Sequence, residues 1–180
     1  MNFDSFAQGQ IASKIWLCEQ LEPYIPCNST IDILGGWYNV LGFMLKVRKP
    51  EHYGLIRNID IDSEAINIAN KICNTWASNI YNLVGNPNVN NLIESSVIIN
   101  CSVEHFENNN WFNDVKKGTL VCIQSSDITD PEPPWLITLP NPNLESLLTR
   151  FPVSTLLFSG TKALPYRDGH YNRLMMIGIV

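Results

Sequence analysis

The sequence predicts an α/β fold in which helices cover a mostly parallel sheet. Three observations lead to this prediction. Short apolar runs alternate with segments of helical periodicity, a glycine pair follows the first of these runs, and the second ends in acidic residues. An order of strand, helix, strand, helix implies parallel strands joined by right-handed crossovers. We therefore expect ligands to bind where the strands end.

Length and composition narrow the class of protein. The chain has 180 residues, 45% of them hydrophobic, which favours a single domain over residues 1–180. The formal charge of -5 gives no basic excess, so nucleic acid is a disfavoured partner. The five cysteines form no C-x-x-C pair, which predicts neither a disulfide framework nor a metal site. Because the chain shows neither a leader segment nor a long apolar run, we expect a cytoplasmic protein without a membrane span.

The chain begins with a predicted helix. Apolar residues recur every three or four positions between Asp4 and Glu22, and Pro23 then favours a stop. Asp4 or Ser5 is expected as the N-cap. Residues 1–28 thus form a helix and a linker before the first strand.

The first strand is predicted at Ile31–Leu34, directly before Gly35 and Gly36. From Trp37 onwards, apolar residues fall at positions i, i+3, i+4, i+7 and i+8, the spacing of one helical face. Glycine permits a sharp turn between the two elements. It also leaves room for a ligand to approach the bare N–H groups at the helix start.

A second strand is predicted over residues 53–61, and Asp62 or Ser63 is expected to cap the helix that follows it. A short third strand at residues 80–84 precedes an Asn-rich loop. Residues 96–102 form an apolar run that turns polar abruptly, which is typical of a central parallel strand.

The remaining elements are predicted from the same patterns. They are a short helix at 111–115, a buried strand at 119–123, a Pro-rich loop at 130–143, a helix at 143–151, and final strands at 154–159 and 172–180.

With these elements in place, the chain resembles the class I S-adenosylmethionine-dependent methyltransferases, as a small and atypical member. The resemblance covers residues 29–180 by order of elements. It implies a Rossmann-like three-layer sandwich whose sheet has seven strands, the last antiparallel and inserted beside the fifth. The family's glycine motif is acid-x-Gly-x-Gly-x-Gly, and Asp32 and Gly36 match its acid and its middle glycine. Leu34 and Tyr38 replace the other two glycines, so the loop differs from the usual one.

The acid at the end of the second strand matches the family better. By this resemblance, Asp60 would accept hydrogen bonds from the ribose hydroxyls of S-adenosylmethionine, and Ile61 would pack on its adenine. The whole set of cofactor-binding residues that the resemblance implies is Gly35, Gly36, Trp37, Tyr38, Asp60, Ile61, Asn100, Cys101 and Ser102. The family's acid after the third strand is not recognisable in residues 86–91.

The residues after the fourth strand argue against nucleic-acid amines as the methyl acceptor. Enzymes of this family that methylate nucleic-acid amines often carry Asp or Asn, Pro, Pro and an aromatic residue there, and residues 100–105 do not. His105 is the best candidate for a general base, because a histidine can accept a proton near neutral pH. Glu104 could orient it or bind the acceptor. A solvent-exposed, hydrogen-bonded surface histidine is the alternative.

Aromatic residues near the glycine turn allow two interpretations. Trp37, Tyr38 and Trp111 could form a wall around a cation or a ring, or they could pack in the core.

The sequence therefore predicts an S-adenosylmethionine-dependent methyltransferase that acts on a small molecule or a protein group. One alternative transfers the aminocarboxypropyl group of the same cofactor. Another is a non-catalytic binding or scaffold protein with a methyltransferase-like fold.

Overall fold

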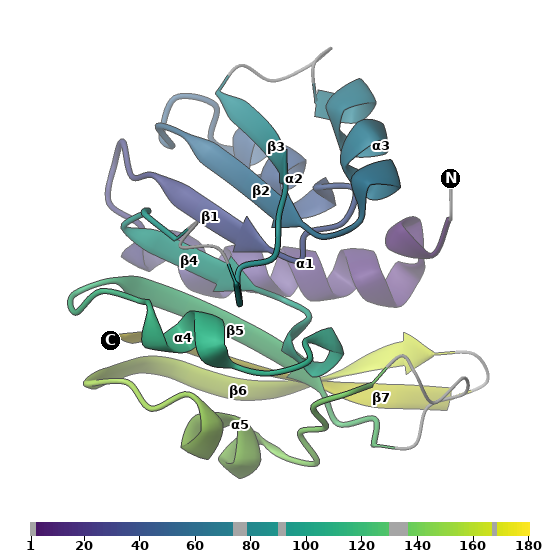
Figure 1. The fold of residues 1–180 in the computed structure, drawn as a ribbon. Helices are drawn as coiled ribbons and strands as arrows, with labels where there is room; N and C mark the ends of the chain where they lie inside the picture. Colours follow the sequence, from purple (N-terminus) through teal and green to yellow (C-terminus); the bar gives the residue numbers. More distant parts are fainter. Residues whose placement is uncertain (1–2, 74–78, 90–92, 130–136, 167–168) are drawn as a thin grey trace.

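The computed structural model describes residues 3–73, 79–89, 93–129, 137–166 and 169–180. Its strands form one sheet in the order β3-β2-β1-β4-β5-β7-β6 (Figure 1). The strand bounds are β1 Ile31–Leu34, β2 Ile56–Asp60, β3 Ile80–Val84, β4 Val97–Asn100, β5 Leu120–Ser126, β6 Thr155–Tyr166 and β7 Gly169–Ile179.

Helices lie on both faces of this sheet (Figure 1). Their bounds are η1 Phe3–Phe6, α1 Gln8–Leu21, η2 Glu22–Tyr24, α2 Val40–Arg48, α3 Ser63–Cys73, η3 Val103–His105, α4 Asn110–Asn113 and α5 Leu144–Arg150. None of the helices in the described ranges is long and apolar enough to cross a membrane.

The pairing of the strands confirms the predicted topology. β1 pairs in parallel with β2 and β4, and the pairs β2–β3 and β4–β5 are parallel too. β7 runs antiparallel to β5 on one side and to β6 on the other. The seven-stranded, Rossmann-like sheet therefore carries its last strand antiparallel beside the fifth, as predicted.

Both faces of the central strands are buried, which explains their continuous apolar runs. Ile31, Ile33 and Ile99 pack against α1 and α2, whereas Leu34 and Ile98 pack on the opposite face. That second face is covered by residues of α4 and α5.

Several predicted boundaries shift. α1 begins at Gln8 with Ala7 as its N-cap and without a side-chain cap, so it starts later than the N-cap predicted at Asp4 or Ser5. α2 begins at Val40 rather than Trp37, because Trp37 and Asn39 adopt left-handed backbone angles that a helix excludes. β6 and β7 are longer than predicted because they pair with each other along their whole length. Of the predicted Pro-rich loop, residues 130–136 lie outside the described residues.

Other predictions hold closely. β1 and β3 have the predicted bounds. Asp62 Oδ1 accepts hydrogen bonds from the backbone N–H groups of Glu64 and Ala65, so Asp62 is the predicted cap of α3.

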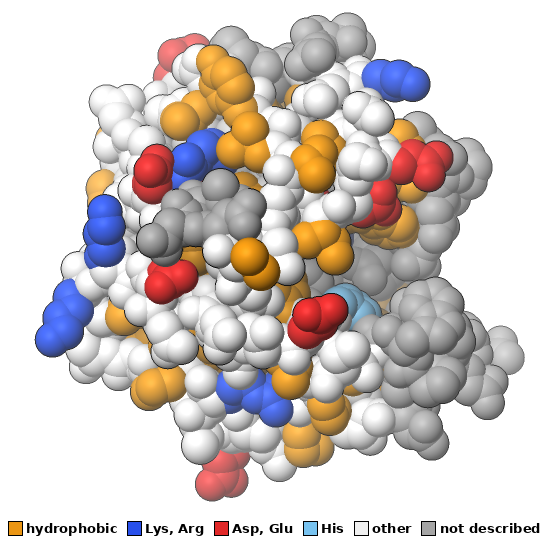
Figure 2. All heavy atoms as spheres, in the orientation of Figure 1, with side chains coloured by type: hydrophobic (Ala, Val, Ile, Leu, Met, Phe, Trp, Pro, Cys, Tyr) orange, Lys and Arg blue, Asp and Glu red, His pale blue; other side chains and the backbone are white. Residues whose placement is uncertain are grey.

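The edge of the sheet at β3 exposes apolar side chains (Figure 2). Tyr81 and Val84 on β3 are more than half exposed, and so are Ile61 and Val89 nearby. Val84 and Ile61 lie at the carboxyl ends of β3 and β2, whereas Tyr81 lies near the start of β3.

Candidate active site

The turn between β1 and α2 has an unusual backbone. Gly35 has φ of 63°, and two residues that are not glycine, Trp37 and Asn39, have φ of 52° and 56°. Left-handed angles at residues with a side chain cost free energy and persist where surrounding contacts hold them. One such contact is the hydrogen bond that Gly42 N donates to Asn39 Oδ1, which caps α2.

Gly35 lies where the ends of β1 and β4 meet. A Cβ atom at this position would lie 2.8 Å from Ser102 Oγ and 2.9 Å from Phe106 Cε2. Ser102 Oγ also donates a hydrogen bond to Gly35 O over 3.2 Å. The predicted convergence of the glycine turn and residues 100–105 is thus present in the structure. Glycine is required here because groups of the protein itself approach closely.

Gly36 is required for a similar reason. A Cβ atom on Gly36 would lie 2.2 Å from Asn58 Oδ1 and 2.8 Å from Ile33 Cγ2. The side chain of Asn58 comes from β2 and is fully buried. The second glycine therefore makes room for a neighbouring strand.

Asp60 ends β2 beside this turn and is only 9% exposed. Trp37 N donates to its Oδ2 over 2.8 Å, and Asp62 N donates to its Oδ1 over 3.0 Å. Burial raises the pKa of Asp60, and these N–H groups oppose the shift without cancelling it. A carboxylate offers about four acceptor positions, so each oxygen can accept a further hydrogen bond.

Asn100 ends β4 and is fully buried. Its Oδ1 accepts a hydrogen bond from Ser102 N over 3.1 Å. Its Nδ2 has no hydrogen-bond partner in the described part of the chain. A buried donor without a partner is costly, and a ligand oxygen could satisfy this one.

Glu104 and His105 belong to η3, but their surroundings differ. Glu104 is buried, and its Oε1 accepts from Arg173 Nη1 over 2.9 Å and from Ser126 N over 3.1 Å. The Arg173 guanidinium also donates to Cys101 O. His105, in contrast, is exposed. Glu104 therefore joins η3 to β5 and β7, while His105 faces solvent.

Arg173 is not among the residues predicted for the site. Its signal was a charged residue directly before the apolar run of the last strand, where a cation must find a buried partner.

The three aromatic side chains of the predicted wall do not form one. Trp37 and Tyr38 stack on each other with ring centroids 4.5 Å apart, and they pack against α2 and α3. Trp111 is fully buried in the cluster on the opposite face, where its ring lies 5.7 Å from that of Phe151. Trp111 is thus a core residue.

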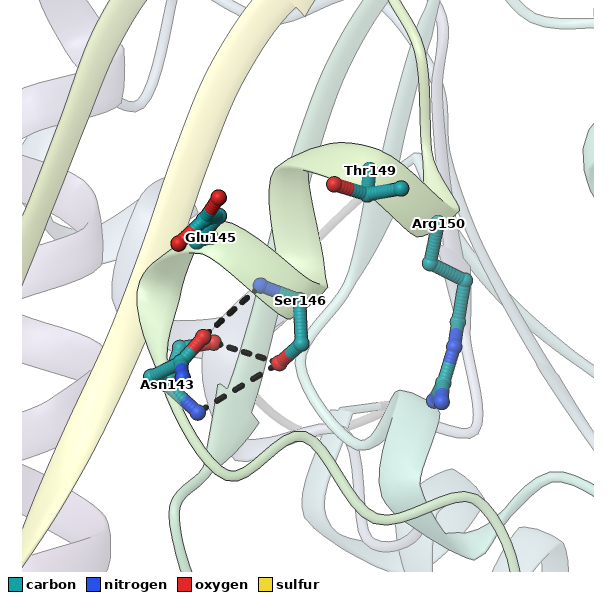
Figure 3. A pocket seen from close by; sticks show the side chains of 5 residues that line it. All are labelled: Asn143, Glu145, Ser146, Thr149 and Arg150. Carbon is teal, nitrogen blue, oxygen red and sulfur yellow. Dashed lines mark hydrogen bonds between the residues drawn. The ribbon is translucent and has the colours of Figure 1, made fainter.

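Two surface hollows lie away from this region. The first is on α5, where Asn143 and Ser146 hydrogen-bond each other in a capping box and Arg150 donates to backbone carbonyls (Figure 3). Glu145 and Thr149 complete its lining. The second is lined by Ile93, Glu94, Asp114 and Lys116. Neither contains a residue of the predicted site.

The chain resembles known proteins in structure. No protein-family model matches the sequence, and no curated protein matches it. Among solved structures, the N-methyltransferase NodS from Bradyrhizobium japonicum WM9 superposes with a TM-score of 0.72 at 14% identity, over 98% of this chain and 99% of that one. The chain has the class I methyltransferase fold.

Two further structures share the class I fold. NodS in complex with S-adenosyl-L-homocysteine gives a TM-score of 0.70 at 15% identity, over 98% of this chain and 90% of that one. A SAM-dependent methyltransferase from Aquifex aeolicus gives a TM-score of 0.62 at 15% identity, over 91% of this chain and 89% of that one. In this class I fold, the turn after β1 and the ends of β2 and β4 lie together, and these are the segments that carry the predicted cofactor residues.

Proposed function

We propose that this protein is a methyltransferase that binds S-adenosylmethionine at the carboxyl ends of β1, β2 and β4. The observation that supports this most directly is the carboxylate of Asp60. Backbone N–H groups hold it on both oxygens, and each oxygen keeps capacity for one more hydrogen bond. Two hydroxyls on adjacent carbons, as in a ribose, match that capacity.

The other residues of the site fit the same ligand. Ile61 follows Asp60 and is 70% exposed, so it offers an apolar surface to a flat base. The free Nδ2 of Asn100 offers a buried donor to a ligand oxygen. The turn at Gly35, Gly36, Trp37 and Tyr38, together with Cys101 and Ser102, would border the remainder of the cofactor. When bound, this cofactor supplies a methyl group on a positively charged sulfur.

The acceptor is proposed to be a small molecule or a protein group. His105 is the candidate base for an acceptor that arrives protonated, because it is exposed at the carboxyl end of β4. Glu104 is proposed as its positioning residue, since Glu104 anchors η3 to Arg173 and Ser126. Positioning supplies most of the acceleration in an in-line displacement.

Calorimetric titration with S-adenosylmethionine and S-adenosylhomocysteine tests the proposal. We expect both to bind the wild type, and Asp60→Ala to weaken binding. Glu64→Ala is the matched control, because it removes an exposed carboxylate from the first turn of α3. No heat at millimolar ligand with the wild type would refute cofactor binding. Equal affinity in Asp60→Ala would refute the ribose role of Asp60.

A second candidate function is a non-catalytic binding protein. The hydrogen bond from Ser102 Oγ to Gly35 O favours it, because this bond joins the ends of β1 and β4 where a ligand would enter. This function predicts no binding of either cofactor form, or binding without turnover. Product analysis separates the remaining alternative, since aminocarboxypropyl transfer leaves methylthioadenosine in place of S-adenosylhomocysteine.

A further inference from the structure

Four asparagine side chains form a chain of hydrogen bonds beneath the β1–α2 turn. Asn82 Oδ1 on β3 accepts from Asn39 Nδ2 over 2.9 Å and from Asn58 Nδ2 over 3.3 Å. Asn82 Nδ2 then donates to Asn70 Oδ1 on α3 over 2.9 Å. The chain therefore links the turn, β2, β3 and α3.

Backbone partners determine the direction of these hydrogen bonds. Gly42 N donates to Asn39 Oδ1, and Trp37 O can only accept from Asn58, so the amide nitrogens of Asn39 and Asn58 face Asn82 Oδ1. Asn82 Nδ2 must then face Asn70. Asn39 and Asn58 are fully buried, where amides are costly unless they are bonded. The arrangement thus has little freedom to rotate.

Asn58 connects this network to the turn. Its Nδ2 also donates to Trp37 O over 3.1 Å. Its Oδ1 has no hydrogen-bond partner in the described part of the chain and lies where a side chain on Gly36 would stand. Asp60, two residues further along β2 and on the same face, accepts from Trp37 N. Side chains of one strand therefore bond the N–H and the C=O of Trp37, a residue with φ of 52°.

We infer that Asn58, supported by Asn82, is a positioning residue for the carboxylate of Asp60. It holds Trp37 in its left-handed conformation, so that the N–H of Trp37 points at Asp60 Oδ2. The free acceptor positions of Asp60 are then directed at the ligand. This inference rests on the proposed function, in which Asp60 binds the ribose. In place of the glycines missing at Leu34 and Tyr38, buried amides give the turn its shape.

The test compares Asn58→Ala with the matched control Asn70→Ala. Asn70→Ala removes the far end of the network, and no hydrogen bond joins Asn70 to Trp37 among the described residues. The first measurement is hydrogen exchange of the Trp37 backbone amide in ¹⁵N-labelled protein without ligand, relative to the Val97 amide of β4. We expect Asn58→Ala to speed Trp37 exchange about tenfold relative to Val97, the effect of one ordinary hydrogen bond. Asn70→Ala should stay close to the wild type.

The second measurement is the affinity for S-adenosylhomocysteine, which we expect Asn58→Ala to weaken by about tenfold for the same reason. A purely structural role would speed the exchange of Trp37 and Val97 equally. That result would overturn the inference. So would an unchanged exchange rate of the Trp37 amide together with an unchanged affinity for S-adenosylhomocysteine.

Asn82→Ala provides a second variant, because Asn82 is only partly buried and its loss removes the acceptor for Asn58. If Asn58→Ala does not fold, Asn82→Ala must show the selective change at Trp37, and its absence would overturn the inference. Failure of the proposed function looks different. In that case the wild type binds neither cofactor form, while the exchange experiment still decides whether Asn58 holds Trp37.

Discussion

Glu104 Oε1 and Arg173 Nη1 lie 2.9 Å apart in an ion pair that the protein buries almost completely. The pair joins η3, which carries the candidate base His105, to the antiparallel strand β7. Burying two charges is costly, and mutual attraction offsets that cost only while both partners are present. The position of the candidate base therefore depends on a strand at the other end of the sequence.

Removing one partner should be strongly destabilising. We expect Arg173→Met to lower the free energy of unfolding by about 3–5 kcal/mol, because Glu104 is left buried without a counterion. Combining it with Glu104→Gln should recover part of this loss. Urea unfolding measures both effects, with the exposed Lys117→Met as control. A loss below that of the control would contradict the prediction.

Affinity for S-adenosylhomocysteine should depend on the protonation of Asp60. Burial raises the pKa of this carboxyl group, so it takes up a proton at a higher pH than an ordinary aspartate. A protonated carboxyl loses acceptor capacity, and we expect affinity to fall as the pH is lowered from about 7 towards 4. Calorimetry on the wild type and Asp60→Asn checks this. The variant should bind more weakly and lack this pH dependence. If affinity fell with pH equally in the wild type and in Asp60→Asn, the result would contradict the ribose role of Asp60.

Gly36 and Asn58 should be energetically coupled. We expect Gly36→Ala to destabilise the protein by about 1–3 kcal/mol, since the new methyl group overlaps Asn58 Oδ1. In an Asn58→Ala background that overlap is gone, so the same substitution should cost less. A double-mutant cycle in urea measures the coupling. Additive costs would show that the contact is unimportant.

Glu22 should stabilise the fold in a pH-dependent way. Burial raises its pKa, but the bidentate Arg48 guanidinium, at 2.6 and 3.2 Å, and Lys49 outweigh that effect and lower the pKa overall. The folded state thus binds the proton less tightly than the unfolded state. The stabilisation is present above the unfolded pKa of a glutamate and is lost as the pH falls through the folded pKa.

This gives a measurable difference for Glu22→Gln. Because Arg48 is 38% exposed and water screens the pair, we expect a loss of only about 0.5–1 kcal/mol at neutral pH. The loss should shrink to nothing in acid. Glu19→Gln, which removes an exposed carboxylate near the end of α1, is the control. Urea unfolding of the wild type and Glu22→Gln, from neutral pH into acid, checks the trend. A loss of unfolding free energy that grows in acid would contradict it.

The sequence by itself determined the order of elements and the features that short-range patterns encode. β1 and β3 have their predicted bounds, Asp62 caps α3, and Asp60 ends β2. Apolar periodicity and side-chain caps depend on neighbours a few residues away, so these features can be predicted without knowing the rest of the fold.

Tertiary structure decided what the site residues contact. Glu104 and Arg173 are 69 residues apart in sequence, and only the β5-β7-β6 order brings them together. Asn58 lies on a different strand from the glycine turn, yet it is the reason that Gly36 must lack a side chain. Gly35 and Gly36, which first indicated space for a ligand, accommodate Ser102, Phe106 and Asn58. Glycine spacing shows where a backbone needs room, but the register of neighbouring strands decides which group takes that room.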